Sequence, residues 1–466
     1  MQLGVRRMYK WDRQIKIEDF VFPFGKLDTE NDWVKLAGLV PWDKAEELYA
    51  ARFVNNGHPA HPARVALGAL IIKQRLKCSD EWTVKHVSEN PYLQFFLGMT
   101  EYSNCCPFGA STMVEFRKRF SEDDLATILE MTIPKPKPPN DEDPPNQGTL
   151  IVDATCCPAD IAYPQDINLL DEARRKLEKI IDEVCETDEL QKPRTYRRKA
   201  RKDYLKLAKS KKRTGKQVRS AIKKQLQYIR RDIEYIVGFV QEGAKLTQKQ
   251  KDLLNILTTL YEQQRIMFET RSHSIAQRIV NISQPHVRPI VRGKAKAKTE
   301  FGAKLHISLV DGYARMERIS FEAFNEAEDF FRIVGRYQQH YGRYPARVLA
   351  DKLYRNRDTL AFCKENEIHL TGPPLGRPPK DRELTRLAKR QEYTDLCERN
   401  AVEGAFGTGK TAYGLGRIAA HLKETSICVI GIALLVMNLE KRLRSLLRYF
   451  WWRWFSALSP LIQQTS

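Results

Sequence analysis

The sequence has few of the features that mark a secreted or membrane protein. Its nine cysteines include the adjacent pairs Cys105–Cys106 and Cys156–Cys157 but no CxxC spacing, which argues against a zinc or redox motif. No apolar signal core follows Met1–Lys10, and the longest apolar run, Ile427–Met437, is too short to span a bilayer. These absences favour a reduced, intracellular chain with no membrane partner.

Acidic residues are too few to balance the basic ones. The chain has 78 Lys and Arg residues against 58 Asp and Glu residues, a formal net charge of +20. Most of the excess lies in Arg194–Arg231, where nearly half the residues are basic and Asp203 is the only acid. Such a segment repels itself unless a polyanion neutralises it, which favours nucleic acid over a merely solvated face. The predicted phosphate contacts there are Arg197, Arg198, Lys199, Lys211, Lys212 and Arg213.

Composition changes along the 466 residues indicate two or three domains. Apolar residues at helical spacing alternate with a Pro-rich run, short β-type runs and a long charged region. The predicted segments are a helical DNA-binding domain (1–133), a linker (134–147), a core in two parts (148–166 and 286–440), a basic helical insert (167–285) and a basic, aromatic tail (441–466). This order predicts an α/β fold with a mixed sheet interrupted once.

Individual elements can be predicted inside these segments. Apolar spacing predicts helices over 61–77, 330–341 and 355–366, and Ser79 and Ser111 are suited to cap two further helices. Short strands are predicted over 149–153, 347–351 and 368–370. A hairpin is predicted from 304–310 and 315–321, with its turn at Asp311-Gly312.

Three carboxylates stand out by their position. Asp153 and Asp351 each close a predicted strand, and Glu403 lies in a predicted helix with Arg399 four residues before it and Lys410 seven after it. These three helix positions share one face, because the helix has 3.6 residues per turn. A carboxylate between two cations is suited to hold a metal beside a phosphate, but a surface ladder of ion pairs explains the spacing equally well.

Two other readings compete with this one. Asp160 and Asp311 are rival acids, and Asp311 is the main rival to Asp351 although its turn position explains it without chemistry. The run Gly404–Thr411 also matches a phosphate-binding loop, but the polar residues before it do not resemble the strand that such a loop requires. The three glycines after Glu403 weaken the predicted helix.

The segment Arg399-Asn-Ala-Val-Glu403-Gly-Ala-Phe-Gly-Thr-Gly-Lys410 resembles the final signature of bacterial insertion-sequence transposases of the insertion-sequence-five group. The family pattern also has a Tyr three residues before the Arg, where this chain has Leu396. Further segments that resemble the family are Leu150–Thr155, Phe301–His306 and Val436–Glu440, and Pro62–Phe120 resembles the helical domain that precedes its catalytic core.

The resemblance implies a ribonuclease H-like core in which Asp153, Asp351 and Glu403 hold two Mg²⁺ ions, with Mn²⁺ as a substitute. It implies cleavage at transposon ends and strand transfer into target DNA, with Arg399 and Lys410 on DNA phosphates. The expected partner is double-stranded DNA, bound by a homodimer, and the expected location is the bacterial cytoplasm at the nucleoid. The alternatives are a DNA-binding protein, an inactive transposase relic and a nuclease of the same fold.

Overall fold

The computed structural model describes residues 15–22, 25–53, 60–135, 144–291, 299–372 and 382–463. It divides into two compact units, the first formed by Met1–Pro158 with Lys304–Ser466 and the second by Ala159–Ala303. The predicted helical domain and the two parts of the predicted core lie mainly in the first unit, and the insert lies in the second. The linker predicted over 134–147 falls partly outside the described residues.

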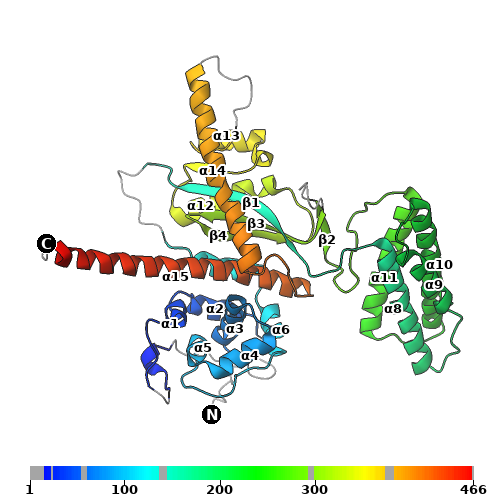
Figure 1. Cartoon of the computed structure of the whole chain (residues 1–466). Helices are drawn as coiled ribbons and strands as arrows, with labels where there is room; N and C mark the ends of the chain where they lie inside the picture. The colour runs from blue at the N-terminus through cyan, green and yellow to red at the C-terminus, as the bar shows by residue number, and fades with distance from the viewer. Residues whose placement is uncertain are drawn as a thin grey trace, which may run out of the picture. The chain divides into compact units, whose positions relative to one another are not determined.

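A mixed sheet lies at the centre of the first unit (Figure 1). Its strands lie in the order β4-β3-β1-β5-β6, with β1 parallel to β5, β5 parallel to β6 and β3 antiparallel to β4. This confirms the mixed α/β sheet that the sequence predicts. The strands are β1 (Thr149–Pro158), β3 (Thr299–Val310), β4 (Tyr313–Ser320), β5 (Arg347–Leu349) and β6 (His369–Leu370). An additional strand, β2 (Arg288–Val291), pairs with the first residues of β3 in the second unit.

The elements predicted around this sheet are present with small shifts in their ends. Asp311 and Gly312 form the turn between β3 and β4 with φ of 52° and 72°, so the turn explains Asp311 as expected. Helix α12 (Phe330–Tyr341) buries Phe330, Val334 and Tyr337 against β1 and β5, and α13 (Arg357–Glu365) follows β5. Strand β1 continues past Asp153 to Pro158, because the small and apolar residues after Asp153 are buried in the sheet.

Seven α-helices precede the sheet in the described residues. Helix α3 is buried along most of its length, and the side chain of Ser79 accepts a hydrogen bond from Trp82 N at the start of α4, as predicted. Ser111 precedes α6 as predicted, but its side chain makes no capping hydrogen bond. Their bounds are α1 (Asp32–Ala37), α2 (Trp42–Ala50), α3 (Ala63–Leu76), α4 (Asp80–Glu89), α5 (Pro91–Phe96), α6 (Thr112–Arg119) and α7 (Glu122–Met131).

Two long helices complete the first unit. Helix α14 (Arg382–Ala412) includes the glycines after Glu403, so the predicted helix is present despite them. Helix α15 (Lys423–Gln463) packs against α3, α6, α7 and β4, and runs beside the N-terminal helices (Figure 1). The predicted tail 441–466 is therefore helical to Gln463, although its side chains from 449 onward lie outside the described residues. Among the described residues, no helix is long and apolar enough to cross a membrane.

Asn438 fixes α15 to the sheet. Its side-chain amide is buried, and it both donates to the carbonyl of Ala314 on β4 and accepts from the Ala314 backbone N–H, each at 2.9 Å. One side chain thus satisfies both backbone groups of a strand residue, which would otherwise be costly to bury. Asn438 lies in the segment Val436–Glu440, for which the sequence indicated only a resemblance.

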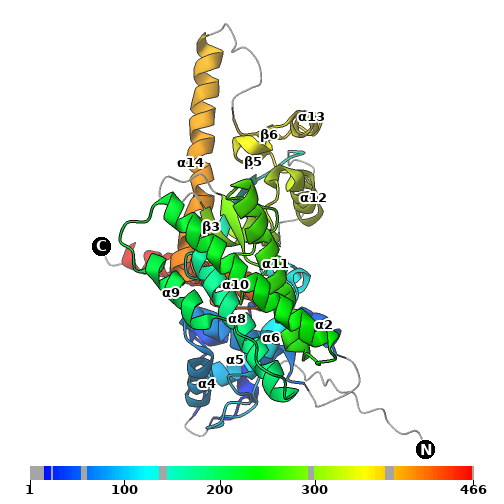
Figure 2. The ribbon, with the colours of Figure 1, turned by 90° about the vertical axis from the view of Figure 1, so that its right-hand side faces the viewer.

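The second unit contains four long helices: α8 (Asp166–Thr187), α9 (Arg197–Ala208), α10 (Gly215–Gln241) and α11 (Gln248–Thr270). They lie side by side in Figure 2 and share a core that includes Leu177, Ile181, Ile229 and Leu257. The capping boxes at Thr214 and Thr247 fix where α10 and α11 begin.

A buried acid lies inside this bundle. Neither carboxylate oxygen of Asp232 has a hydrogen-bond partner in the described part of the chain, and the side chain is inaccessible to solvent. Burial, followed by the charge of Glu178, raises the pKa of Asp232 to about 7, although the Arg174 guanidinium opposes the shift. The folded bundle therefore retains a proton on Asp232 at a pH where the unfolded chain has lost it.

We expect Asp232→Asn to remove a pH dependence from the stability of the bundle. The wild type should lose stability as the pH rises from about 4, where the unfolded carboxyl ionises, to about 7, where the folded one does. At pH 8 the variant should be more stable by about 2 kcal/mol. Hydrogen exchange of α8 and α10 amides at pH 5 and pH 8 measures this. The exposed Glu186→Gln is the control, and equal pH dependence in Asp232→Asn and wild type would contradict the assignment.

Candidate functional site

The pairing of β1 with β5 brings Asp153 and Asp351 together. Thr149 lies opposite Arg347 and Ile151 lies opposite Leu349 in a parallel register. Each acid comes two residues after the last of these pairs, so the two carboxylates follow at the same level on neighbouring strands. Asp351 ends its strand as the cap of a short 3-10 helix, Lys352–Tyr354. Two residues that are distant in the sequence thus form one acidic site.

The electrostatic surroundings of Asp153 confirm that these charges are close. Burial raises the pKa of Asp153, and the carboxylates of Glu326 and Asp351 raise it further, whereas the Arg399 guanidinium lowers it. Asp153 accepts a hydrogen bond from its neighbour Ala154 N at 2.8 Å, and Asp351 accepts one from Lys352 N at 2.6 Å. In each carboxylate this leaves one oxygen without a hydrogen bond inside the described ranges.

Polar contacts hold α14 against this part of the sheet. The buried Asp395 accepts hydrogen bonds from Arg347 on β5 at 3.2 Å and pairs with His369 on β6 at 2.7 Å. Val402 and Phe406, one and three turns further on, are buried as well. Arg399 lies on the same stripe of the helix, which explains why its charge acts on Asp153.

Glu403 and Lys410 lie further along α14. Glu403 is exposed one turn beyond Arg399, and Lys410 is partly exposed two turns beyond Glu403. Asp153 and Asp351 supply the hard oxygen atoms that Mg²⁺ prefers, and a dication would offset the repulsion that raises the pKa of Asp153, so their chemistry fits this ion. Among the described residues, however, no three His, Cys, Asp or Glu side chains are arranged so that they could hold a metal ion.

The match to a phosphate-binding loop is excluded by the structure. Gly404–Thr411 lies entirely inside α14, and the residues before it belong to the same helix. A phosphate-binding loop requires a strand, then an open loop whose backbone N–H groups face the phosphates. These N–H groups instead belong to a continuous helix, so this segment cannot bind a nucleotide in that way.

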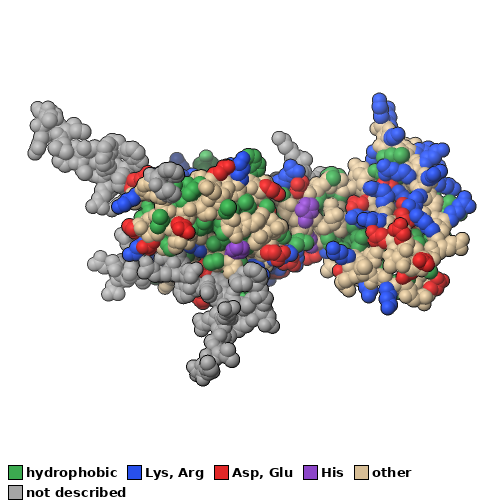
Figure 3. All heavy atoms as spheres, turned by 90° about the horizontal axis from the view of Figure 1, so that it is seen from below, with side chains coloured by type: hydrophobic (Ala, Val, Ile, Leu, Met, Phe, Trp, Pro, Cys, Tyr) green, Lys and Arg blue, Asp and Glu red, His purple; other side chains and the backbone are tan. Residues whose placement is uncertain are grey.

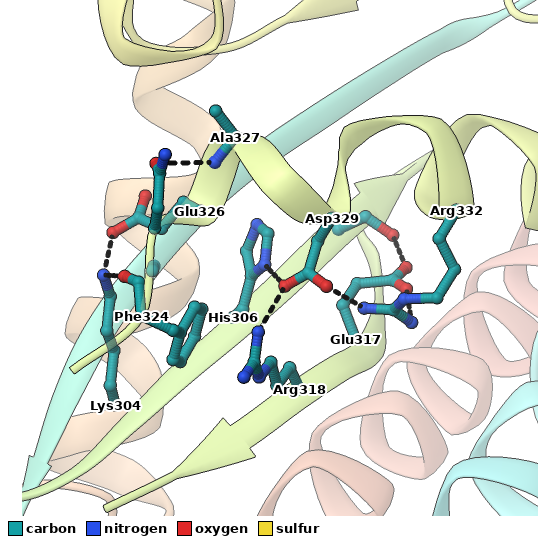
Figure 4. A network of polar contacts seen from close by, with 12 residues as sticks. Lys304, His306, Glu317, Arg318, Phe324, Glu326, Ala327, Asp329 and Arg332 are labelled. Carbon is teal, nitrogen blue, oxygen red and sulfur yellow. Dashed lines mark hydrogen bonds and ion pairs between the residues drawn. The ribbon is translucent and has the colours of Figure 1, made fainter. Parts of the chain in front are cut away.

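A polar network beside the acids was not predicted from the sequence. Lys304 on β3 pairs with Glu326 at 2.8 Å, and the buried Tyr354 hydroxyl donates to the other Glu326 oxygen at 3.2 Å. The same hydroxyl is bonded to His306 Nε2 at 2.8 Å, and His306 Nδ1 is bonded to Asp329 (Figure 4). Burial lowers the pKa of His306 despite Asp329, so the imidazole is neutral at pH 7.

This network gives a structural role to the segment Phe301–His306. Lys304 and His306 are two residues apart on one strand, so their side chains share a face of the sheet. They reach the start of α12 through Glu326 and Asp329, and Figure 4 shows Asp329 between His306, Arg318 and Arg332. The alternation of a Lys and a His in an otherwise apolar strand was the available sequence signal.

The predicted phosphate contacts in the second unit differ in their surroundings. Lys and Arg side chains gather over this unit (Figure 3). Arg197 is bonded to Asp182 through two hydrogen bonds of 2.9 Å, and Arg213 is bonded to Gln165 and to the Ala208 carbonyl. The other four are exposed and make no ion pair within the described residues: Arg198, Lys199, Lys211 and Lys212. Arg197 and Arg213 therefore have structural roles.

Two segments of the chain match families of known proteins. Residues 348–440 match the family described as Transposase DDE domain, and residues 24–119 match the family described as Transposase domain (DUF772). A protein of Rhizobium meliloti, described as uncharacterized protein ORF8 in the nfe locus, is 33% identical over 136 residues. This alignment covers 29% of the present chain and 66% of the relative. No solved structure matches the chain.

Both matches are to transposase domains, so a transposase is the class of protein that the chain resembles at both ends of the first unit. The DDE match contains Asp351, Arg399, Glu403 and Lys410, and Asp153 lies outside it. The match implies a ribonuclease H-like core for the mixed sheet and a family of phosphoryl-transfer enzymes. The second match spans the helices from α1 to α6.

Proposed function

We propose that this protein is a DNA transposase of the insertion-sequence-five group that cleaves DNA at transposon ends and joins those ends to target DNA. The observation that carries the proposal is the parallel pairing of β1 with β5, which sets Asp153 beside Asp351 with the charge of Arg399 acting on them. The matches to two transposase domains support the same conclusion.

In the proposed reaction, water attacks the phosphodiester at the transposon end, and the bond from phosphorus to the 3′ oxygen breaks. The end keeps a 3′-hydroxyl, and the flanking strand keeps a 5′-phosphate. This hydroxyl then attacks a phosphodiester of the target, whose own 3′ oxygen leaves. Two Mg²⁺ ions, for which Mn²⁺ can substitute, would activate the attacking oxygen and stabilise the leaving one.

Three residues are proposed to hold the metal ions. Asp153 and Asp351 offer the oxygen atoms that have no hydrogen bond, and Glu403 is the proposed third ligand. Arg399 and Lys410 are proposed to bind phosphates on the same stretch of α14. The tether between Asp395 and Arg347 would keep this helix in register with β5, so that Arg399 stays near Asp153.

Double-stranded DNA is the proposed partner of both units. In the second unit, the exposed cations without ion pairs, such as Arg198 and Lys199, are proposed to bind the DNA backbone. A transposase that acts on two ends needs two active sites, so we propose a homodimer on DNA. The proposed location is the bacterial cytoplasm at the nucleoid, where the substrate is found.

The test uses DNA that carries the ends of the element itself. We expect the protein to nick these ends in Mg²⁺ or Mn²⁺, to be inactive in EDTA, and to yield products in which an end is joined to a second DNA. Gel analysis separates the outcomes. Cleavage without joining would make the protein a nuclease, and tight binding without cleavage in any divalent ion would leave a DNA-binding protein or an inactive relic.

A further inference from the structure

A groove lies between α14, α15 and the turn that joins β3 to β4. It encloses about 330 Å³, and all of its lining belongs to the first unit. The α14 side is formed by small residues at helical spacing, and the α15 side carries three cations. The residues that define this α14–α15 groove are Ala401, Gly404, Ala405 and Thr408 on α14 and Lys441, Arg444 and Arg448 on α15.

The three cations form one face of α15. Their spacing of three and four residues places them on successive turns toward the groove. Lys441 lies over the Tyr313 ring at 4.9 Å, and burial, together with the charges of Arg444 and Arg448, lowers its pKa against the pull of Asp311. None of the three makes an ion pair with any described residue, so their charges repel one another unless an anion binds.

The opposite wall of the groove has an unexplained glycine. A Cβ atom at Gly404 would meet nothing within 4 Å, so close packing inside the protein does not require glycine there. Glycine in the middle of a helix is unfavourable relative to almost any other residue except proline. An open wall of small side chains opposite a row of cations allows close approach of an extended anionic chain.

We propose that the α14–α15 groove binds the sugar-phosphate backbone of DNA. This inference rests on the proposed function and adds a DNA contact on a face of α14 other than that of Glu403. The occupant is a DNA strand because three unpaired cations in a row match successive phosphates, whereas a single small anion would leave two of them uncompensated. The helical positions of Gly404 and Ala405 leave room for the strand against α14.

Two variants of the full-length chain test the groove. Replacing Lys441, Arg444 and Arg448 together by Gln should weaken binding of a 30-base-pair duplex about 30-fold and reduce the salt dependence of binding by two to three phosphate contacts, by roughly 0.9 per contact. Gly404→Leu should fill the groove and weaken binding without a change of charge, because Leu is compatible with a helix. Fluorescence anisotropy across a salt series measures both effects.

The matched controls lie next to the tested positions. Gly407 is on the same helix, also has open space around it, and does not line the groove, so Gly407→Leu should bind DNA as the wild type does. Arg442→Gln, adjacent to Lys441 but outside the groove, should reduce the salt dependence less. Circular dichroism establishes that each variant is folded. If the triple variant and Gly404→Leu bind like their controls, the groove does not bind DNA.

This outcome can be distinguished from failure of the proposed function. A wild-type protein that cuts its ends while both groove variants bind and cut normally would overturn the groove alone. A wild-type protein that neither binds nor cuts DNA would overturn the proposed function and the groove with it. Loss of binding in the groove variants, with binding retained in Gly407→Leu, supports the proposal.

Discussion

Replacing either Asp153 or Asp351 by Asn should reduce DNA cleavage by roughly 1,000-fold or more, because metal ions contribute several kcal/mol to such a reaction. Asn keeps the size of the side chain but removes the charge that would bind a divalent ion. DNA binding in the presence of Ca²⁺ or EDTA should remain within a few-fold of the wild type. Initial rates of end nicking in Mg²⁺, measured at saturating protein, test the expectation.

Asp311 provides the matched control for this pair. It is the strand-end acid that competes with Asp351 in the sequence, and it lies in a turn with φ of 52°, a conformation that Asn adopts readily. Asp311→Asn should therefore fold normally and cleave at close to the wild-type rate. If instead Asp311→Asn abolished cleavage and Asp351→Asn did not, the acidic site would have been assigned to the wrong edge of the sheet.

Removing three cations from α9 should weaken binding to duplex DNA by about 100-fold near 0.1 M salt, because each lost phosphate contact releases fewer counterions. Arg198, Lys202 and Lys206 are spaced by four residues, so they share one face of the helix, and all three are exposed. Their joint replacement by Gln should also lower the slope of log K against log salt by about 3.

The control for this experiment removes the same charge elsewhere in the second unit. Lys245, Lys249 and Lys251 are exposed around the start of α11, and their replacement by Gln changes the net charge equally. Equal losses of affinity in the two triple variants would mean that α9 contributes only to the overall charge. Arg197→Gln should behave differently from both, since it breaks the pair with Asp182 and lowers stability.

The sequence predicts best the elements whose patterns are local. Helix α12 follows from apolar residues at helical spacing, and the β3–β4 hairpin follows from its Asp-Gly turn. The two strands that end in Asp153 and Asp351 were found in the same way. Their pairing could not be derived locally, because register depends on contacts between segments that are distant in the chain.

The polar network and α15 show where sequence reasoning ended. Lys304, Glu326 and Tyr354 come from three separate segments, and no spacing within any one segment indicates that the side chains meet. The length of α15 was missed because the apolar run before Asn438 gives way to basic and aromatic residues, a pattern that suits a tail as well as a helix. Glu403 was placed on a helix, but its third-ligand role stays a prediction.

The pairing of β1 with β5 also determines when the acidic site can form during synthesis. Asp153 and Asp351 are separated by 198 residues, and the whole second unit is synthesised between them. Contacts at such a separation form late, because a long stretch of chain must be closed before they gain anything. A nascent chain that has completed its N-terminal helices and its basic bundle could therefore already hold DNA while it still lacks the acidic pair. Premature termination before β5 would yield a protein with basic DNA-binding surfaces and no means of cutting, which would compete with the full-length chain for its own ends.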